Sequence, residues 1–159
     1  MKNGLYLPQF DFDSCGVGFV ANLKGVKSHK IVSDAITMLE NMEHRGATGY
    51  EKSTGDGAGI QIQIPHEFLY EKALENGFYL PDVGDYGLGM LFFPKDDALR
   101  DECKRVIYNS AEKLNYKILG YRSVPVNNFE IGETAKSVEP VMEMIFIEKP
   151  FDVTSDDDF

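Results

Sequence analysis

The sequence has few cysteines, few histidines and no long apolar run, and each shortage excludes a class of protein. Its two cysteines, Cys15 and Cys103, lie far apart and form no CxxC pair. A disulfide scaffold or a structural zinc site is therefore not expected, whereas a reducing compartment is. No stretch approaches the roughly 18 apolar residues of a membrane helix, and residues 1–14 lack a signal-peptide core. We expect a cytoplasmic protein with no membrane partner.

Positive charge is also scarce. The 159 residues include 16 lysines and arginines against 26 acidic residues, which gives a formal net charge of −10. Nucleic acid is an unsuitable partner because its phosphates require a basic surface. The length and the 43% of hydrophobic residues suffice for one soluble domain with its own core.

Hydrophobic periodicity predicts strands and helices in alternation. Strands are predicted over residues 15–23, 60–64, 86–93, 116–126 and 138–149, and helices over residues 28–46, 65–77 and 96–115. Between the first helix and the second strand, residues 46–59 are glycine-rich and predict a loop. This order permits a parallel α/β sheet or an α+β sandwich. The "IQIQI" stretch at residues 60–64 alternates apolar with polar residues, which favours the α+β class.

The faces of the predicted helices can also be assigned. In the first helix, the apolar positions at helical spacing are Ile31, Ala35, Met38, Leu39 and Met42. In the third helix, we expect the side chains that face the core to be Leu99, Cys103, Val106, Ile107 and Leu114.

Cys15, in the stretch "DSCGVGF", has two interpretations. It can be a small apolar residue of a buried strand, which is the commoner role of a lone cysteine. It can also be a nucleophile, which requires a base. Three histidines are present, but no spacing supports a particular Cys/His pair. The α-amine of a cysteine at the N-terminus would be an alternative base, with a pKa of about 7.7–8.0, and it exists only after cleavage of the bond between Ser14 and Cys15.

Two features after the first helix are also ambiguous. Arg45, in the predicted last turn, can be a solvated partner of the helix dipole or a bidentate ligand for a carboxylate. The stretch "TGDGAG" at residues 54–59 lacks the Lys-Ser/Thr of a P-loop and the order GxGxxG. It can be a tight turn before the next strand, with Asp56 capping that turn.

The order of these motifs resembles the start of the large subunit of glutamate synthases. "CGVGF", an amphipathic helix and then "MEHRGATGYEKSTGDGAGI" follow one another, with the tightest likeness over residues 15–64. The "HRG" after a helix is shared with class II glutamine amidotransferases generally, and "EHRGA" followed by "TGDGAGI" is typical of the glutamate synthase branch.

The resemblance implies residue roles and a fold. Residues 1–14 would be a propeptide and residues 15–159 the N-terminal portion of a type-2 amidotransferase domain, with Cys15 as the nucleophile. Arg45 would hold the α-carboxylate of glutamine, and Thr48, Gly55 and Asp56 would lie beside the pocket. The implied fold is an Ntn-hydrolase-like, four-layer αββα sandwich with largely antiparallel sheets, incomplete in this chain.

The implied reaction is hydrolysis of L-glutamine to glutamate and ammonia, with the ammonia used to aminate 2-oxoglutarate in downstream synthase domains of the same chain. FMN and an iron–sulfur cluster would belong to those domains, and the resemblance allows for a separate small reductase subunit. The family's oxyanion hole comes from an Asn-Gly pair later in the chain. Residues 65–159 offer no convincing equivalent, since Asn76-Gly77 is the predicted end of a helix. Because one missing donor can lower the rate by about 10²–10³, we expect this segment alone to be inactive.

Two other functions stay open at this point. One is a non-catalytic acidic α/β module in which Cys15 only packs. The other is an Ntn amidotransferase of another branch, against which the long stretch between "HRGA" and "GDGAGI" argues.

Overall fold

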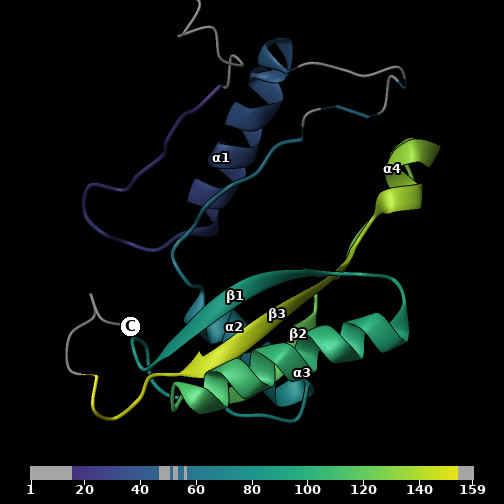
Figure 1. Ribbon diagram of the computed structural model, residues 1–159. Coiled ribbons are helices and arrows are strands. Elements are labelled where there is room, and N and C mark those ends of the chain that lie inside the picture. Colours follow the sequence, from purple (N-terminus) through teal and green to yellow (C-terminus); the bar gives the residue numbers. More distant parts are fainter. Residues whose placement is uncertain (1–15, 47–50, 52–53, 56, 154–159) are drawn as a thin grey trace, which may run out of the picture. The chain divides into compact units, whose positions relative to one another are not determined.

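The computed structural model describes residues 16–46, 51, 54–55 and 57–153, and divides the chain into two units. These are Met1–Ile62 and Gln63–Phe159, and each is treated by itself. The described residues contain four α-helices, one 3₁₀ helix and three strands (Figure 1). None of the helices described is long and apolar enough to cross a bilayer.

The first unit is organised around one helix. Helix α1, His29–Asn41, begins at Ser28, whose hydroxyl accepts a hydrogen bond from the Lys30 amide at 3.1 Å. Ser28 is therefore the N-cap of this helix. All of the apolar positions predicted for one face of this helix are half-buried, namely Ile31, Ala35, Met38, Leu39 and Met42.

Two predicted strands are wrong in this structure. Residues 16–22 and 60–64 have no regular secondary structure, and no described backbone is hydrogen-bonded to them as a strand. Val17 and Phe19 are each 90% exposed, and the three isoleucines of "IQIQI" are 42–47% exposed. An alternating pattern gives a segment an apolar face, but a strand forms only when a neighbour satisfies its N–H and C=O groups.

The second unit contains the sheet. Strands β1 (Tyr86–Phe93) and β2 (Lys117–Ser123) flank β3 (Val141–Glu148), and each pairs antiparallel with it. Because β1 and β2 run in the same direction on either side of β3, the segment β1–α3–β2 is a split β-α-β unit. The sheet confirms the α+β class over the parallel alternative.

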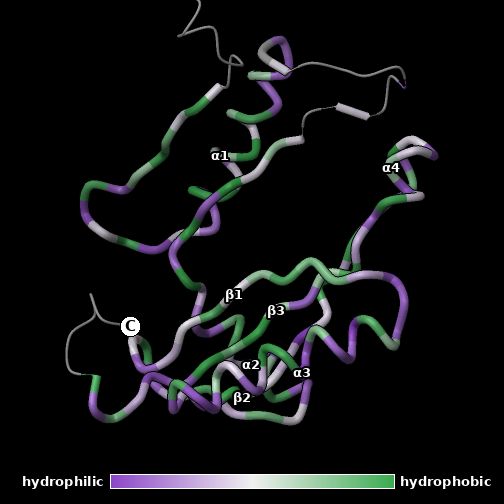
Figure 2. The backbone as a smooth tube through the Cα atoms, viewed as in Figure 1, coloured by the Kyte–Doolittle hydropathy of each residue, from purple (hydrophilic) through white to green (hydrophobic). Residues whose placement is uncertain are grey.

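One face of the sheet packs on helix α2, His66–Glu75, and carries the main core. The core consists of Leu69, Ala73, Leu80, Tyr86 and Phe146. Strand β3 is largely hydrophobic in Figure 2, as the central strand between two others should be. The predicted stop at residues 76–77 is confirmed. Gly77 adopts φ +82°, and the Phe78 amide donates to the Ala73 carbonyl, which completes a Schellman motif.

Helix α3, Asp97–Lys113, lies on the opposite face of the sheet (Figure 1). Asp96 is its N-cap, and Asn115 ends it with φ +59°. The predicted inward face is wrong for Leu99, Val106 and Leu114, which are 54–66% exposed, whereas Cys103 and Ile107 are half-buried. The side that meets the sheet carries Lys104, which pairs with Glu143 of β3, and the half-buried or buried residues on the same side of the helix are Arg100, Ile107 and Ala111.

A fourth helix, α4 (Glu133–Val138), was not predicted. It lies in the connection between β2 and β3, which extends away from the sheet in Figure 1. Its six residues are too few for periodicity to reveal. The Lys95 ammonium donates to the Lys136 carbonyl at 2.7 Å and joins this connection to the end of β1.

Candidate functional site

Shortly after Cys15, the backbone of Gly18 comes close to the Met38 side chain of α1. A Cβ atom on Gly18 would be 2.4 Å from the Met38 Sδ, closer than any real contact of this kind. A side chain at residue 18 would therefore require the flexible Met38 side chain to move aside. The backbone of Gly18 thus approaches α1, the helix that leads to Arg45, while Val17 and Phe19 on either side of it are exposed.

Arg45 is the last residue of the 3₁₀ helix η2, Glu43–Arg45, which follows α1 after a single turn residue, Met42. The helix ends at Gly46, whose amide donates to the Glu43 carbonyl at 3.0 Å. His44 donates from Nδ1 to the Asn41 carbonyl at 3.1 Å, so it is a structural donor at the helix end. The local hydrogen bonding therefore places Arg45 at the junction of the helix and the glycine-rich loop.

The glycine-rich loop is described only in part. In the described part, the Thr54 amide donates to the Glu51 carbonyl at 3.0 Å, and the Thr54 hydroxyl donates to the Glu51 carboxylate at 3.1 Å. Gly55 is exposed. Gly57 has φ +84°, a conformation that explains a glycine at this position.

Three of the five predicted site residues fall outside the described part of the chain. These are Cys15, Thr48 and Asp56. For Arg45 only the backbone is described, so the predicted pocket stays a prediction.

A polar cluster in the second unit joins α3 to the sheet. The Glu143 carboxylate, in a residue only 7% exposed, lies 2.7 Å from the Lys104 ammonium. That ammonium also lies 4.9 Å from the centre of the Tyr121 ring and 5.6 Å from that of Phe93. A buried carboxylate requires such a partner. A charged residue inside the apolar run "VMEMIF" was the sequence signal for this contact.

Two tyrosines of the sheet differ in how their hydroxyls are satisfied. The Tyr86 hydroxyl lies 3.1 Å from His66 Nδ1, at the first residue of α2. The Tyr121 hydroxyl is buried and has no hydrogen-bond partner among the described residues. Burial raises the pKa of Tyr86, and burial followed by the charge of Glu143 raises the pKa of Tyr121.

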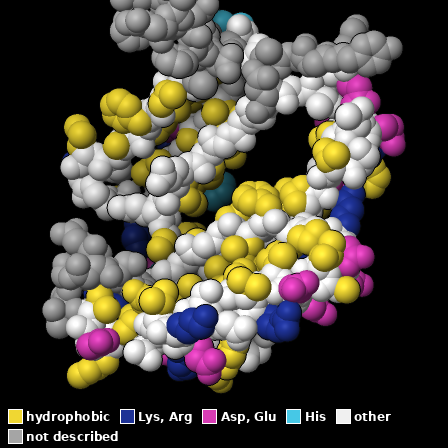
Figure 3. Space-filling view, viewed as in Figure 1, with side chains coloured by type: hydrophobic (Ala, Val, Ile, Leu, Met, Phe, Trp, Pro, Cys, Tyr) yellow, Lys and Arg dark blue, Asp and Glu magenta, His cyan; other side chains and the backbone are white. Residues whose placement is uncertain are grey.

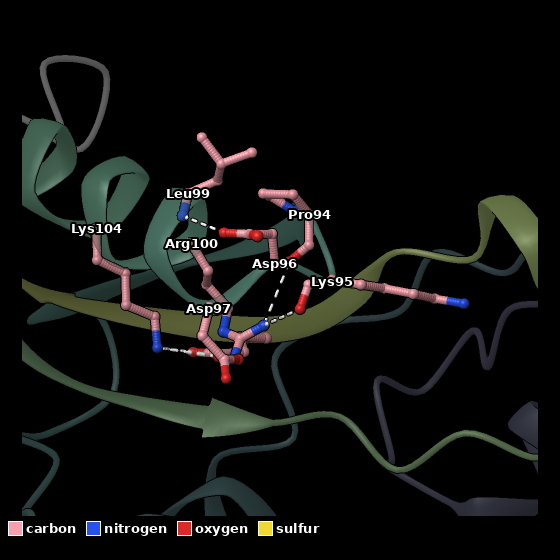
Figure 4. A network of polar contacts seen from close by, with 8 residues as sticks. Pro94, Lys95, Asp96, Asp97, Leu99, Arg100 and Lys104 are labelled. Atoms are coloured by element: carbon pink, nitrogen blue, oxygen red, sulfur yellow. Dashed lines mark hydrogen bonds and ion pairs between the residues drawn. The ribbon is translucent and has the colours of Figure 1, made fainter.

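The start of α3 is fixed by a second network (Figure 4). Asp96 accepts from the Leu99 amide at 2.9 Å, and the Arg100 guanidinium donates to the Pro94 and Lys95 carbonyls at 3.3 Å each. This network and the Lys104–Glu143 pair bind the helix to the end of β1 and to β3. Within the described residues, no group of three or more His, Cys, Asp or Glu side chains could hold a metal ion.

Known proteins match this chain over nearly its whole length. The family model of the class II glutamine amidotransferases matches residues 15–159. The chain is 43% identical over 146 residues to a glutamate synthase [NADH] of Saccharomyces cerevisiae, covering 89% of this chain and 7% of that protein. It is 43% identical over 134 residues to the ferredoxin-dependent glutamate synthase 2 of Arabidopsis thaliana, covering 84% and 8% respectively.

A bacterial glutamate synthase matches the chain to a similar extent. The glutamate synthase [NADPH] large chain of Bacillus subtilis is 40% identical over 144 residues, which cover 91% of this chain and 9% of the relative. This chain therefore spans less than a tenth of the length of each of these relatives. The resemblance drawn from residues 15–64 is confirmed, and the chain belongs to the class II glutamine amidotransferases.

Proposed function

We propose that this chain is the N-terminal portion of the amidotransferase domain of a glutamate synthase, and that the enzyme hydrolyses L-glutamine to glutamate and ammonia. The observation that carries the proposal is the family match, which begins at Cys15 and extends to Phe159. The names of the relatives favour the glutamate synthase branch over other amidotransferases.

In the proposed mechanism, residues 1–14 are a propeptide whose removal makes Cys15 the N-terminal residue. The freed α-amine takes the thiol proton, and the thiolate attacks the side-chain amide carbon of glutamine. The C–N bond breaks, and the amine returns the proton to the departing ammonia. Water then cleaves the glutamyl thioester to glutamate and the free thiol. The proximity of the amine and the thiol in one residue makes this base effective.

The substrate's α-carboxylate is assigned to Arg45, whose guanidinium can bind it bidentately. Two observations support this: the backbone of Arg45 ends a 3₁₀ helix at the edge of the glycine-rich loop, and Gly18, three residues after Cys15, comes close to Met38 of the preceding helix. Thr48, Gly55 and Asp56 belong to the same loop region, and we place them beside the pocket.

The complete domain would adopt the four-layer αββα sandwich of Ntn hydrolases. The antiparallel sheet with a helix on each face is compatible with that fold but is only a part of it. The oxyanion hole would be contributed by a later Asn-Gly pair, so this segment alone should release little ammonia from glutamine. Appreciable glutaminase activity of the isolated 159-residue chain would contradict this part of the proposal.

The cofactors of the reductive half-reaction would lie elsewhere. An iron–sulfur cluster is held by several cysteine thiolates, and the whole sequence has two cysteines. The cluster therefore does not fit this segment, and FMN is likewise assigned to the downstream domains. We propose those domains, and in some glutamate synthases a small reductase subunit, as the partners of this segment. We also propose that the enzyme is cytoplasmic.

The deciding experiment is Cys15→Ala in the full-length enzyme. Glutamine-dependent glutamate synthesis should fall to background, whereas ammonia-dependent synthesis should persist because the second site is untouched. Cys103→Ala, at the other cysteine of this chain, is the matched control and should retain glutamine use. A non-catalytic packing role for Cys15 predicts instead that Cys15→Ala is harmless. Intact-mass measurement tests processing, since an active enzyme that still carries Met1 would exclude the propeptide.

A further inference from the structure

Glutamine makes two contacts in the proposed mechanism, and the length of the substrate fixes the distance between them. Its α-carboxylate is assigned to Arg45, and its side-chain amide meets the Cys15 thiol. The separation of these two protein groups therefore decides whether a bound glutamine is also aligned for attack. A residue that sets this separation must lie between the chain that follows Cys15 and the helix that leads to Arg45.

Met38 lies at that place. It is half-buried on α1, and the three heavy atoms nearest to a Cβ built on Gly18 are its Sδ, Cε and Cγ, all within 3.5 Å. Gly18 is not among the described glycines with positive φ. A side chain at residue 18 is therefore limited by the space that the thioether fills and not by strain of the backbone.

The chain before Gly18 and the helix after Met38 lead toward the same end of α1. The chain turns back at residues 22–25, where the Gly25 amide donates to the Asn22 carbonyl at 3.0 Å and Gly25 has φ +68°. The purple segment before this turn therefore runs opposite to α1 (Figure 1). Moving back along that segment and moving forward along α1 are thus movements in one direction.

The two stretches of chain that start from this contact are similar in length. Three residues separate Gly18 from Cys15, which is at most about 11 Å of extended chain. Seven residues separate Met38 from Arg45, which is about 10 Å along a helix. The helical stretch is continuous up to η2, because the Met42 amide donates to the Met38 carbonyl at 3.2 Å. The position of Gly18 on Met38 therefore influences the separation of the two proposed substrate contacts.

The side chains next to Gly18 point away from the protein. Val17 and Phe19 are each 90% exposed. Figure 3 shows hydrophobic side chains at the surface of the first unit, over α1 and the segment before it. Because these side chains are not buried, the distance of the segment from the helix depends on the bare backbone of Gly18 and on the side chain that it meets.

We propose that Met38 is a positioning residue for the nucleophile. Its thioether sets the distance of Gly18 from α1 and, through it, the distance between the Cys15 thiol and the Arg45 guanidinium. Met38 itself touches no substrate. A displacement of about 1 Å at the reacting atoms can lower the rate by about a hundredfold. This inference rests on the proposed function, because it takes Cys15 as the nucleophile and Arg45 as the ligand of the carboxylate.

The test is a double-mutant cycle in the full-length enzyme, with kcat and KM for glutamine hydrolysis as the readout. Met38→Ala removes the thioether and Gly18→Ala forces it aside, so each should lower kcat by about tenfold to a hundredfold. In the double variant the new methyl group occupies part of the vacated space, and kcat should exceed that of either single variant. Leu39→Ala is the matched control, because Leu39 is also half-buried on α1, and it should keep kcat close to that of the parent enzyme.

Ammonia-dependent glutamate synthesis shows that each variant is folded, and all of them should retain it. A higher KM with unchanged kcat in Met38→Ala would overturn the proposal, because binding and not alignment would have changed. Equal losses in Met38→Ala and Leu39→Ala would overturn it too, as would single losses that simply multiply in the double variant. Cys15→Ala separates the two proposals. If it abolishes glutamine use while Met38→Ala is harmless, only the positioning role is wrong, and if Cys15→Ala is harmless, the proposed function is wrong as well.

Discussion

The hydroxyl of Tyr121 leads to the prediction that a core substitution, Tyr121→Phe, raises the free energy of unfolding instead of lowering it. This hydroxyl is buried without a hydrogen-bond partner in the described part of the chain, while that of Tyr86 pairs with His66 Nδ1 at 3.1 Å. Both tyrosines belong to the same sheet, on β2 and β1. Tyr121→Phe and Tyr86→Phe therefore remove the same atom from two different environments.

The magnitudes follow from the hydrogen bonds. Desolvating a hydroxyl without compensation costs about 1–3 kcal/mol in mutational data. Removing the Tyr121 hydroxyl recovers part of that cost, but it also leaves a small void, so we expect a net stabilisation of about 0.5–1 kcal/mol. The Tyr86 hydroxyl is paired, and its loss leaves the half-buried His66 nitrogen without that partner. Tyr86→Phe should therefore destabilise the protein by about 0.5–1.5 kcal/mol.

Urea unfolding of the two variants at neutral pH measures both effects, with unchanged m-values as the check on the two-state analysis. The Lys104 ammonium over the Tyr121 ring should be retained, since phenylalanine also offers an aromatic face. A Tyr121→Phe variant that unfolds at lower urea than the parent protein would refute the reasoning, because it would show that the hydroxyl makes a stabilising bond.

The same two tyrosines predict behaviour at alkaline pH. The pKa of each is raised in the folded state above the ordinary value of 10.0. A raised pKa means that the folded state holds the phenol proton more tightly, so this contribution to stability is complete below pH 10 and is lost as pH rises through the folded-state pKa. Tyr121→Phe should flatten the fall in unfolding free energy above pH 10, as measured by urea titrations at several pH values.

The remaining predictions concern packing, capping and the nucleophile. Gly120→Ala would place a Cβ 2.4 Å from the Phe78 ring, and we expect it to lower the unfolding free energy by about 1–3 kcal/mol in chemical denaturation. Gly59→Ala is the control and should leave the unfolding free energy unchanged, because a Cβ there meets nothing within 4 Å. Asp96→Ala removes the N-cap of α3 and should cost about 1 kcal/mol, while Asp97→Ala, next to it, should cost under about 0.5 kcal/mol by the same assay. Equal losses from the two aspartates would contradict the capping assignment. Cys15→Ala, described above, tests the catalytic assignment by loss of glutamine-dependent synthesis alone.

Much of the local structure was predictable because it depends on neighbours in the sequence. Ser28 and Asp96 cap their helices by bonding amides two or three residues on, and the Asn76-Gly77 stop needs only a residue that tolerates positive φ. The family was predictable for a related reason, since its motifs are contiguous. A strand depends instead on a partner that is distant in the sequence. The strand predicted at residues 60–64 is therefore wrong: its alternating pattern is clear, but no described strand pairs with it.

By itself, then, the sequence determined where α1, α2 and α3 begin, the α+β class and the family that supplies Cys15 and Arg45 with proposed roles. Only the tertiary structure decided which strands pair, that β3 lies between β1 and β2, and which side of α3 meets the sheet. Periodicity identifies an apolar stripe on α3 but does not say what it faces. A single buried carboxylate, Glu143, turned the helix to present Lys104, because an unpaired buried charge costs more than the exposure of Leu99 and Val106.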